Sequence, residues 1–147
     1  MAATRRASVS WDGDLASGSG KTSGISSGVF SLLPVSWASR TETPEDRTSP
    51  EELLAAAHAS CYAMALSGGL AGAGTPPEHL DVIADVTFDK VGDAWTVVSS
   101  ALTVHGRVPE IDPATFTQAA ETARDGCPIS RALAGNVKLS VEASLEN

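Results

Sequence analysis

The residues of this chain best suited to chemistry are its two cysteines, Cys61 and Cys127. Two thiols are too few for a disulfide framework, and without a close pair of histidines they cannot complete a structural zinc site, so no metal is expected. What remains is a choice between buried filler and redox chemistry, in which one thiol attacks and the other resolves through a disulfide. Their spacing does not show that they meet.

Taken alone, the local sequence makes Cys127 the more acidic thiol. It follows a glycine and precedes a proline, which is typical of the N-cap of a short helix, where the helix dipole favours a thiolate. A simple turn that holds a small residue is an equal alternative. Cys61 lies within a run of helix formers, where cysteine is usually core filler, and it would need a neighbouring cation to lower its pKa. Arg40 and Arg47 are the cations just upstream.

Two further side chains near Cys61 have both a structural and a functional explanation. Glu51 complements the dipole of the helix that begins beside it, and its ten-residue separation from Cys61 corresponds to about 15 Å of helical rise. A site shared by Glu51 and Cys61 would therefore need another segment or another chain. His58 could pair with Cys61 for acyl transfer, although a helical histidine beside the core more often bonds backbone or solvent.

The helix that carries Cys61 begins with a capping signal. Ser49 supplies an N-cap hydroxyl, Pro50 suits the first helical position, and Glu52 stands at N3, as in a capping box. The "SGG" at residues 67–69 is predicted to end the helix. The predicted inward face is the one on which small and apolar residues recur at three- and four-residue spacing: Leu54, Ala57, Cys61, Met64 and Ala65. Cys61 is therefore expected to face the core.

Short strands and turns surround this helix in the order of an α+β domain. The predicted upstream strands span residues 6–11, 28–33 and 35–40, with turns at "DGD" and "SGSGK". The predicted downstream elements are a hairpin at 81–91 and 94–106, a helix at 113–126, a short helix after Cys127 and a strand at 136–145. One face of the hairpin is expected to carry Val82, Ala84, Val86 and Phe88. Residues 1–147 are expected to form a single domain.

The composition narrows the class of protein. The chain has 10 Lys and Arg against 18 Asp and Glu, a formal charge of −8, and its cations are scattered. Nucleic acid is therefore not an expected partner. The N-terminal stretch has no apolar segment of the kind found in a leader, and no window approaches the ~18 apolar residues of a membrane span. We expect a soluble, cytoplasmic protein without a membrane partner.

Several motifs together resemble the OsmC branch of the OsmC/Ohr family, the osmotically inducible and organic-hydroperoxide-resistance proteins. They are "TSPEELLAAAHASCYAMALS", "GCPISRAL", "WDGD", "GSGK", "SSGVF", "ADVTFDKV" and "IDPATF", and the resemblance covers nearly the whole chain. It implies an OsmC-like α+β fold in which antiparallel sheets pack on a long central helix that bears a cysteine. It also implies an intertwined homodimer with two active sites at the subunit interface.

The resemblance further implies roles for individual residues. Cys61 looks like the peroxidatic thiol, Cys127 the resolving thiol, and Arg40 with Glu51 an ion pair that orders the site, with Arg47 as the alternative to Arg40. This reverses the choice of attacking thiol that the helix dipole suggests. A desolvated guanidinium beside Cys61 would be a sufficient physical reason, because it stabilises a thiolate more than a helix end does.

The implied activity is that of a thiol peroxidase that reduces organic hydroperoxides to alcohols, and hydrogen peroxide less well. Cys61 would form a sulfenic acid, condense with Cys127 to a disulfide, and be restored by an external dithiol such as a dihydrolipoyl group. No metal, flavin or nicotinamide cofactor is implied. Two alternatives stay open: a redox-sensing interaction module with a reversible Cys61–Cys127 disulfide and no significant turnover, and a hydrolase that uses Cys61 and His58.

Overall fold

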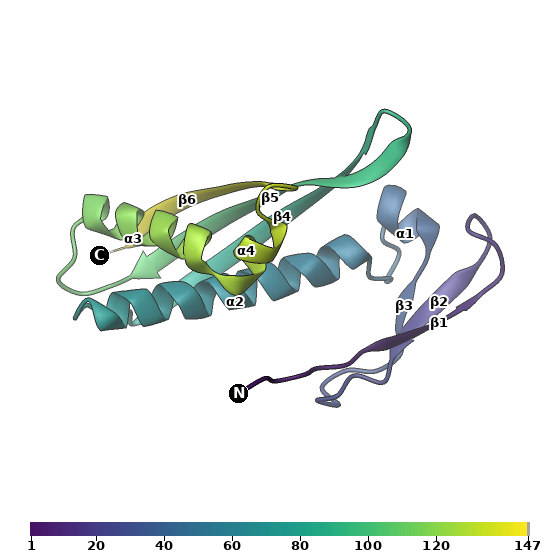
Figure 1. The fold of residues 1–147 in the computed structure, drawn as a ribbon, viewed down its shortest axis with the longest axis horizontal. Helices are drawn as coiled ribbons and strands as arrows, with labels where there is room; N and C mark the ends of the chain where they lie inside the picture. Colours follow the sequence, from purple (N-terminus) through teal and green to yellow (C-terminus); the bar gives the residue numbers. More distant parts are fainter. Residues whose placement is uncertain (147) are drawn as a thin grey trace. The chain divides into compact units, whose positions relative to one another are not determined.

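The computed structural model describes residues 1–146, and the chain divides into two compact units, Met1–Leu53 and Leu54–Asn147. The elements of the first unit are β1 (Ser8–Asp12), β2 (Ser19–Ser23), β3 (Leu33–Val35), α1 (Trp37–Thr41) and the first turn of α2 (Pro50–Gly72) (Figure 1). Those of the second are the rest of α2, β4 (His79–Val91), β5 (Ala94–Arg107), α3 (Pro113–Gly126), α4 (Pro128–Leu133) and β6 (Lys138–Glu146).

The first unit contains a small antiparallel sheet in the order β1-β2-β3. Gly20 of β2 lies opposite Trp11 of β1, and a Cβ added there would come within 2.9 Å of the indole ring. The glycine is thus needed for close packing inside a strand. The predicted turn at "SGSGK" is right only for Ser17 and Gly18, which close the turn between β1 and β2, whereas residues 19–21 belong to β2. Sequence alone does not separate a glycine that permits close approach from one that makes a turn.

Two predicted strands of the first unit are also wrong. Residues 28–32 are neither helix nor strand, and Leu32 has a φ of 56°, which interrupts an extended chain. Residues 37–41 form α1. Ser36 caps this helix, because the Ser39 N–H donates to the Ser36 hydroxyl and the Ser36 N–H donates to the Ser39 hydroxyl, each at 3.1 Å. A capping box closed by serine rather than Glu or Gln at N3 is a weak sequence signal, which is why the helix was not predicted.

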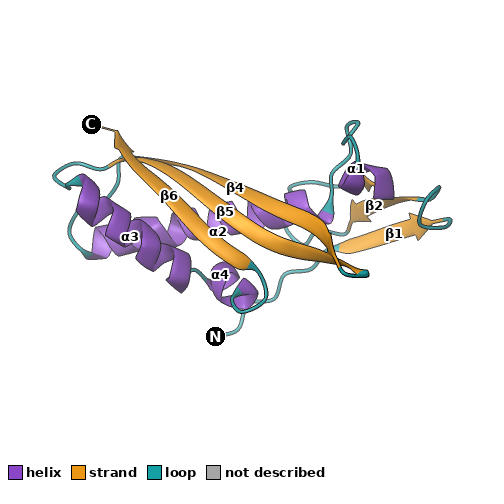
Figure 2. Cartoon of the chain, turned by 90° about the horizontal axis from the view of Figure 1, so that it is seen from above, coloured by secondary structure: helices purple, strands orange, loops and turns teal. Residues whose placement is uncertain are grey.

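The second unit is a three-stranded sheet in the order β4-β5-β6 with helices on one face. Figures 1 and 2 show α3, α4 and the long helix α2 on the same side of this sheet. The predicted hairpin is confirmed, with Val91 opposite Ala94 across a turn in which Gly92 has a φ of 61°. Its predicted face is confirmed as well, since burial alternates along β4 with Val82 and Phe88 on the more buried side.

The last strand differs from the expectation of antiparallel sheets. β6 pairs with β5 in parallel, so the sheet is mixed. Parallel neighbours need a crossover connection, and α3 and α4 provide it by carrying the chain back along the face of the sheet. The predicted helices and final strand are themselves confirmed, including Asp112 as N-cap of α3, whose carboxylate accepts from the Thr115 N–H at 3.0 Å.

α2 continues past the predicted stop at residues 67–69. It ends in a Schellman motif around Gly74, which has a φ of 87°. The Gly74 N–H donates to the carbonyl of Ala71 and the Thr75 N–H donates to that of Leu70, each at 3.0 Å. Leu70 is buried, so the packing of this last turn outweighs the cost of the two glycines within it.

The inward face of α2 in the second unit also differs from the prediction. Its buried residues are His58, Tyr62, Leu66 and Leu70, whereas Met64 is 73% exposed and Cys61 is half-buried. The reason is that α2 is apolar nearly all round. By length and composition alone, α2 is long and apolar enough to cross a membrane, which the sequence analysis did not expect. In such a helix the spacing of apolar residues cannot select a face.

Gly106 of β5 gives a direct test of how tightly this core is packed. A Cβ there would lie 2.5 Å from the buried ring of Phe116 on α3 and 3.2 Å from Leu80. We expect Gly106→Ala to lower the free energy of unfolding by about 1–3 kcal/mol, since a fully buried ring cannot move aside without strain. In urea titrations its midpoint should fall, while Gly72→Ala, where nothing lies within 4 Å, should leave the midpoint unchanged or raise it. Equal midpoints for the two variants would contradict this packing.

Candidate active site

The two cysteines lie on different elements of the second unit, and both are free thiols. Cys61 is on α2 and half-buried, whereas Cys127 is fully buried between α3 and α4. The Cys127 N–H donates to the carbonyl of Ala123 and its carbonyl accepts from the Arg131 N–H, each at 2.9 Å. Cys127 thus closes α3 and opens α4, which confirms its predicted position as an N-cap ahead of a proline.

The fold brings the two thiols together. Cys61 packs against the core cluster that contains Cys127, and each thiol is close enough to shift the pKa of the other. Their separation of 66 positions in the sequence carries no signal of this contact, which depends on α4 returning to α2. Two adjacent free thiols can perform attack and resolution in one site.

The surroundings act on the two thiols in opposite directions. Burial, followed by the interaction with Cys127, raises the pKa of Cys61. Burial also opposes ionisation of Cys127, but the Ser130 N–H and hydroxyl and the Cys61 thiol outweigh it and lower the pKa of Cys127. The Cys127 side chain makes no cap hydrogen bond to α4, so its lowered pKa does not come from regular N-cap geometry. Within one chain, Cys127 is therefore the more acidic thiol.

His58 is fully buried, with hydrogen-bond partners that the sequence did not predict. Its Nδ1 lies 2.7 Å from the hydroxyl oxygen of Ser100 on β5, and its Nε2 lies 2.8 Å from that of Ser130 on α4. Burial lowers the pKa of His58, because it disfavours the charged ring. Both ring nitrogens are engaged by serines, so the arrangement does not favour His58 as a base for Cys61. Its partners are 42 and 72 residues away, which leaves no local signal in the sequence.

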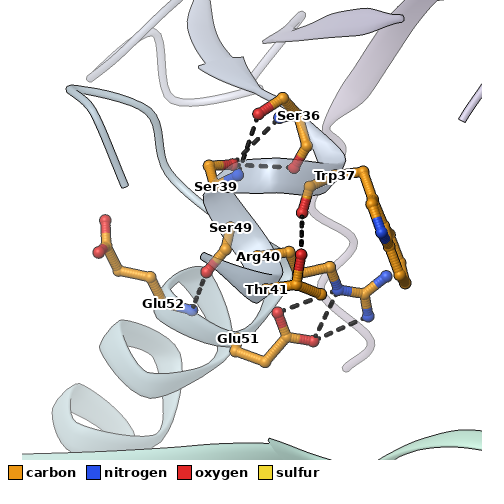
Figure 3. Close-up of polar contacts among 8 residues, drawn as sticks. All are labelled: Ser36, Trp37, Ser39, Arg40, Thr41, Ser49, Glu51 and Glu52. Carbon is orange, nitrogen blue, oxygen red and sulfur yellow. Dashed lines mark hydrogen bonds and ion pairs between the residues drawn. The ribbon is translucent and has the colours of Figure 1, made fainter. Parts of the chain in front are cut away.

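Arg40 and Glu51 form an ion pair in the first unit (Figure 3). Arg40 Nη2 donates to Glu51 Oε1 at 2.8 Å, and Arg40 Nε lies 3.1 Å from both carboxylate oxygens. Glu51 is only 8% exposed, so the pair is shielded on the carboxylate side. The guanidinium carbon lies 5.7 Å from the ring centroid of Trp37, in cation–π range. Arg47, the alternative cation, is exposed in the loop.

Hydrogen bonds around α1 fix the two partners of this ion pair. The Ser39 hydroxyl donates to the carbonyl of Thr48 at 2.9 Å, and the Thr48 N–H donates to that of Pro34 at 2.9 Å. They hold the start of α2 beside α1 and β3. Ser49 caps α2 by accepting from the Glu52 N–H at 3.1 Å, but the Glu52 carboxylate accepts from the Thr48 hydroxyl rather than closing the predicted box. Glu51 is left to face Arg40.

An apolar cleft of about 340 Å³ opens beside Arg40 in the first unit. Its walls include Trp11, Leu15, Val35 and Trp37, and the Arg40 side chain is part of the same lining. Such a cleft suits an apolar ligand with one polar or anionic group directed at the arginine. Arg40 and Glu51 thus form an ion pair in the first unit, and both cysteines lie in the second.

Comparison with known proteins gives consistent matches. A family described as "OsmC-like protein" matches residues 43–142. The protein named peroxiredoxin OsmC of Escherichia coli (strain K12) is 38% identical over 142 residues, which cover 97% of this chain and 98% of that protein. A protein of Bacillus subtilis that is described as uncharacterized, YmaD, is 26% identical over 119 residues, covering 78% of this chain and 79% of that one.

Solved structures show the same fold. The organic hydroperoxide resistance protein OhrB of Bacillus subtilis has a TM-score of 0.73 and 23% identity, with 95% of this chain and 98% of that chain covered. An organic hydroperoxide resistance protein of Elizabethkingia anophelis, with thiocyanate bound, has a TM-score of 0.75 and 22% identity over 99% of both chains. These likenesses confirm the expected α+β fold, with its sheets and long cysteine-bearing helix.

Proposed function

The chain belongs to the OsmC-like protein family and is a peroxidase, and from this premise we propose that it reduces organic hydroperoxides through a two-cysteine cycle. The observation that carries the proposal is the packing of Cys61 against the core cluster that contains Cys127, because a resolving thiol must reach the attacking sulfur. In the proposed roles, Cys61 is the peroxidatic thiol and Cys127 the resolving thiol.

The cycle has three balanced steps. The Cys61 thiolate attacks the hydroperoxide oxygen distal to carbon, the O–O bond breaks, and the alkoxide takes a proton to leave as the alcohol. The Cys127 thiolate then attacks the sulfur of the Cys61 sulfenic acid, the S–S bond forms, the S–O bond breaks, and the hydroxide takes a proton to leave as water. An external dithiol, such as a dihydrolipoyl group, reduces the disulfide and is itself oxidised.

A cation is needed at Cys61, because its surroundings in one chain raise its pKa. Within residues 1–146 the groups that shift it are its own burial, Cys127 and the Ile129 N–H, and none of these is a cation. We assign the role of this cation to Arg40, which forms an ion pair with Glu51. Glu51 and Cys61 are ten residues apart on α2, about 15 Å of helical rise. We therefore propose that the Arg40–Glu51 ion pair and the two thiols come together at the interface of a homodimer.

The exposed face of α2 supports dimerisation. An uncharged stripe of exposed residues at four-residue spacing runs along it: Ala56, Ser60, Met64 and Gly68. Small residues allow close approach, and Met64 would otherwise leave a large apolar side chain in water. A second copy of the chain is the proposed occupant, with two intertwined sites of which each needs residues of both copies.

The cleft beside Arg40 supports an organic rather than an inorganic substrate. An alkyl or aryl tail would displace water from its apolar walls, whereas hydrogen peroxide has no such group and should react less well. No metal, flavin or nicotinamide takes part in the proposed cycle. The proposal treats residues 1–147 as one functional domain, acting in the cytoplasm without nucleic acid or membrane.

Mass spectrometry after one equivalent of hydroperoxide tests the cycle. We expect reduced protein treated with cumene hydroperoxide to lose two hydrogens and to yield a peptide pair joined through Cys61 and Cys127. Cys127→Ser, treated in the same way, should instead hold a sulfenic acid at Cys61. Sulfinic acid at Cys61 of the unsubstituted protein, with no disulfide, would remove Cys127 from the cycle and overturn the proposal.

A further inference from the structure

The proposed cycle gives no role to two buried side chains of α2, His58 and Tyr62. The Tyr62 hydroxyl donates to the carbonyl of Ala120 on α3 at 3.0 Å. His58 Nε2 lies 2.8 Å from the hydroxyl oxygen of Ser130 on α4. All four residues are at most 1% exposed, so water does not compete for either hydrogen bond. We refer to these two hydrogen bonds as the clamp bonds, because each of them joins α2 to a different helix.

The clamp bonds lie on both sides of each thiol along the chain. On α2, one of the two bonded residues precedes Cys61 and the other follows it, all within little more than one helical turn. On the other side, the bonded residue of α3 precedes Cys127 and that of α4 follows it. The Cα atoms of two cysteines must lie within about 7 Å to form a disulfide. A small separation of these helices would therefore prevent the resolving step.

The clamp bond of α4 matters most, because α4 is a helix of six residues. A helix of this length has little stability of its own and depends on its neighbours for its place. The His58–Ser130 bond ties α4 to α2, and Ile129 packs against the core cluster. The other ring nitrogen of His58, Nδ1, lies 2.7 Å from the hydroxyl oxygen of Ser100 on β5. The imidazole is thus fixed against the sheet as well, with both of its nitrogens paired.

We propose that His58 and Tyr62 are positioning residues for the resolving step, because their clamp bonds hold α3 and α4 against α2 and keep Cys127 within reach of Cys61. The inference rests on the proposed two-cysteine cycle. With the clamp bonds in place, the Cys127 thiolate attacks the Cys61 sulfenic acid without a rearrangement of the fold. The S–S bond forms, the S–O bond breaks, and the hydroxide takes a proton to leave as water. The clamp bonds thus raise the effective concentration of one thiol at the other.

The equilibrium of the reduced protein with glutathione disulfide measures this positioning without any peroxide. The protein dithiol gives two electrons to glutathione disulfide, the Cys61–Cys127 bond forms, and two molecules of glutathione are released. The equilibrium constant rises with the effective concentration of the two thiols. We expect Ser130→Ala to lower this constant about threefold to tenfold, the contribution of one buried hydrogen bond. Tyr62→Phe should lower it as well, and because it keeps the packed ring it serves as a second variant if Ser130→Ala does not fold.

Ser100→Ala is the matched control for Ser130→Ala. Each variant removes one buried hydroxyl from the same imidazole, so a general loss of core stability is common to both. Only Ser130 lies on the helix that Cys127 opens, so Ser100→Ala should leave the glutathione equilibrium much less changed. Equal shifts in the two alanine variants would overturn the inference, because a merely structural role does not distinguish the two hydroxyls. An unchanged constant in both Ser130→Ala and Tyr62→Phe would also overturn it.

Stopped-flow kinetics separate this inference from the proposed function. With one equivalent of cumene hydroperoxide, Ser130→Ala should form the sulfenic acid at the unsubstituted rate but the disulfide about threefold to tenfold more slowly. If the unsubstituted protein formed the Cys61–Cys127 disulfide with glutathione but did not consume hydroperoxide, the proposed function would be refuted and the shifts in the variants would still decide the inference. If it consumed hydroperoxide but formed no such disulfide in either experiment, the positioning role would be refuted.

Discussion

Cys61→Ser is expected to abolish the consumption of organic hydroperoxide, by at least about a thousandfold in kcat/KM, because a neutral hydroxyl cannot replace the attacking thiolate. The measurement is steady-state consumption of cumene hydroperoxide with a dihydrolipoyl donor. The buried place of Cys127 gives it no independent access to the peroxide, although it is the more acidic thiol within one chain. It should therefore not substitute for Cys61.

Cys127→Ser is the matched control for this variant, since it removes the other thiol by the same change. We expect it to reduce one equivalent of hydroperoxide at the unsubstituted rate and then to stop or to be over-oxidised at Cys61. Full turnover by Cys61→Ser, with loss in Cys127→Ser, would show that the dipole-based choice of Cys127 as the attacking thiol is correct. Reversible disulfide formation with negligible turnover of the unsubstituted protein would favour the redox-sensing alternative.

Hydrolysis is the remaining alternative, and the place of His58 argues against it. A Cys–His hydrolase needs a histidine nitrogen available to the thiol, whereas both nitrogens of His58 are taken by Ser100 and Ser130. The hydrolase would also cleave esters without any need for Cys127. Ester turnover that survives Cys127→Ser would revive it.

Predictions from sequence succeeded where a local signal was sufficient. The hairpin, α3 and the N-cap at Cys127 depend on neighbouring residues alone, namely an alternating pattern, Asp112 before a proline, and a cysteine between glycine and proline. α1 failed because its capping box uses Ser39 in place of an acidic or amide residue. The inward face of α2 failed because the helix is apolar on nearly every side.

The parts of the site that depend on distant contacts could not be predicted from spacing. The approach of Cys127 to Cys61 requires α4 to fold back onto α2, and the partners of His58 lie on β5 and α4. Roles for Cys61 and Arg40 came from the resemblance of whole motifs to a family. Physical reasoning on a single chain still ranks Cys127 as the more acidic thiol, so the assignment of Cys61 as attacking residue depends on the proposal that a second copy of the chain supplies a cation.

That dependence makes subunit complementation the sharpest test of where Arg40 acts. Arg40→Met removes the charge while keeping a long side chain, and we expect it to lower turnover by about a hundredfold, because a neighbouring cation shifts a thiol pKa by one to three units. Arg47→Met is the control, since Arg47 is exposed in the loop and should leave turnover unchanged. If Arg47→Met were the impaired variant, the assignment of Arg40 would be wrong.

Co-expression of Arg40→Met with Cys61→Ser then decides which subunit supplies the arginine. Each variant alone is nearly inactive, but a mixed dimer with sites built from both chains contains one site that has Cys61 from one copy and Arg40 from the other. Random pairing makes half of the dimers mixed, each with one of two sites restored, so about a quarter of the unsubstituted activity should return. If Arg40 served the cysteine of its own chain, every site would lack one residue and no activity would return. Recovery of about a quarter would therefore establish the homodimer and the origin of the cation at Cys61 in one measurement.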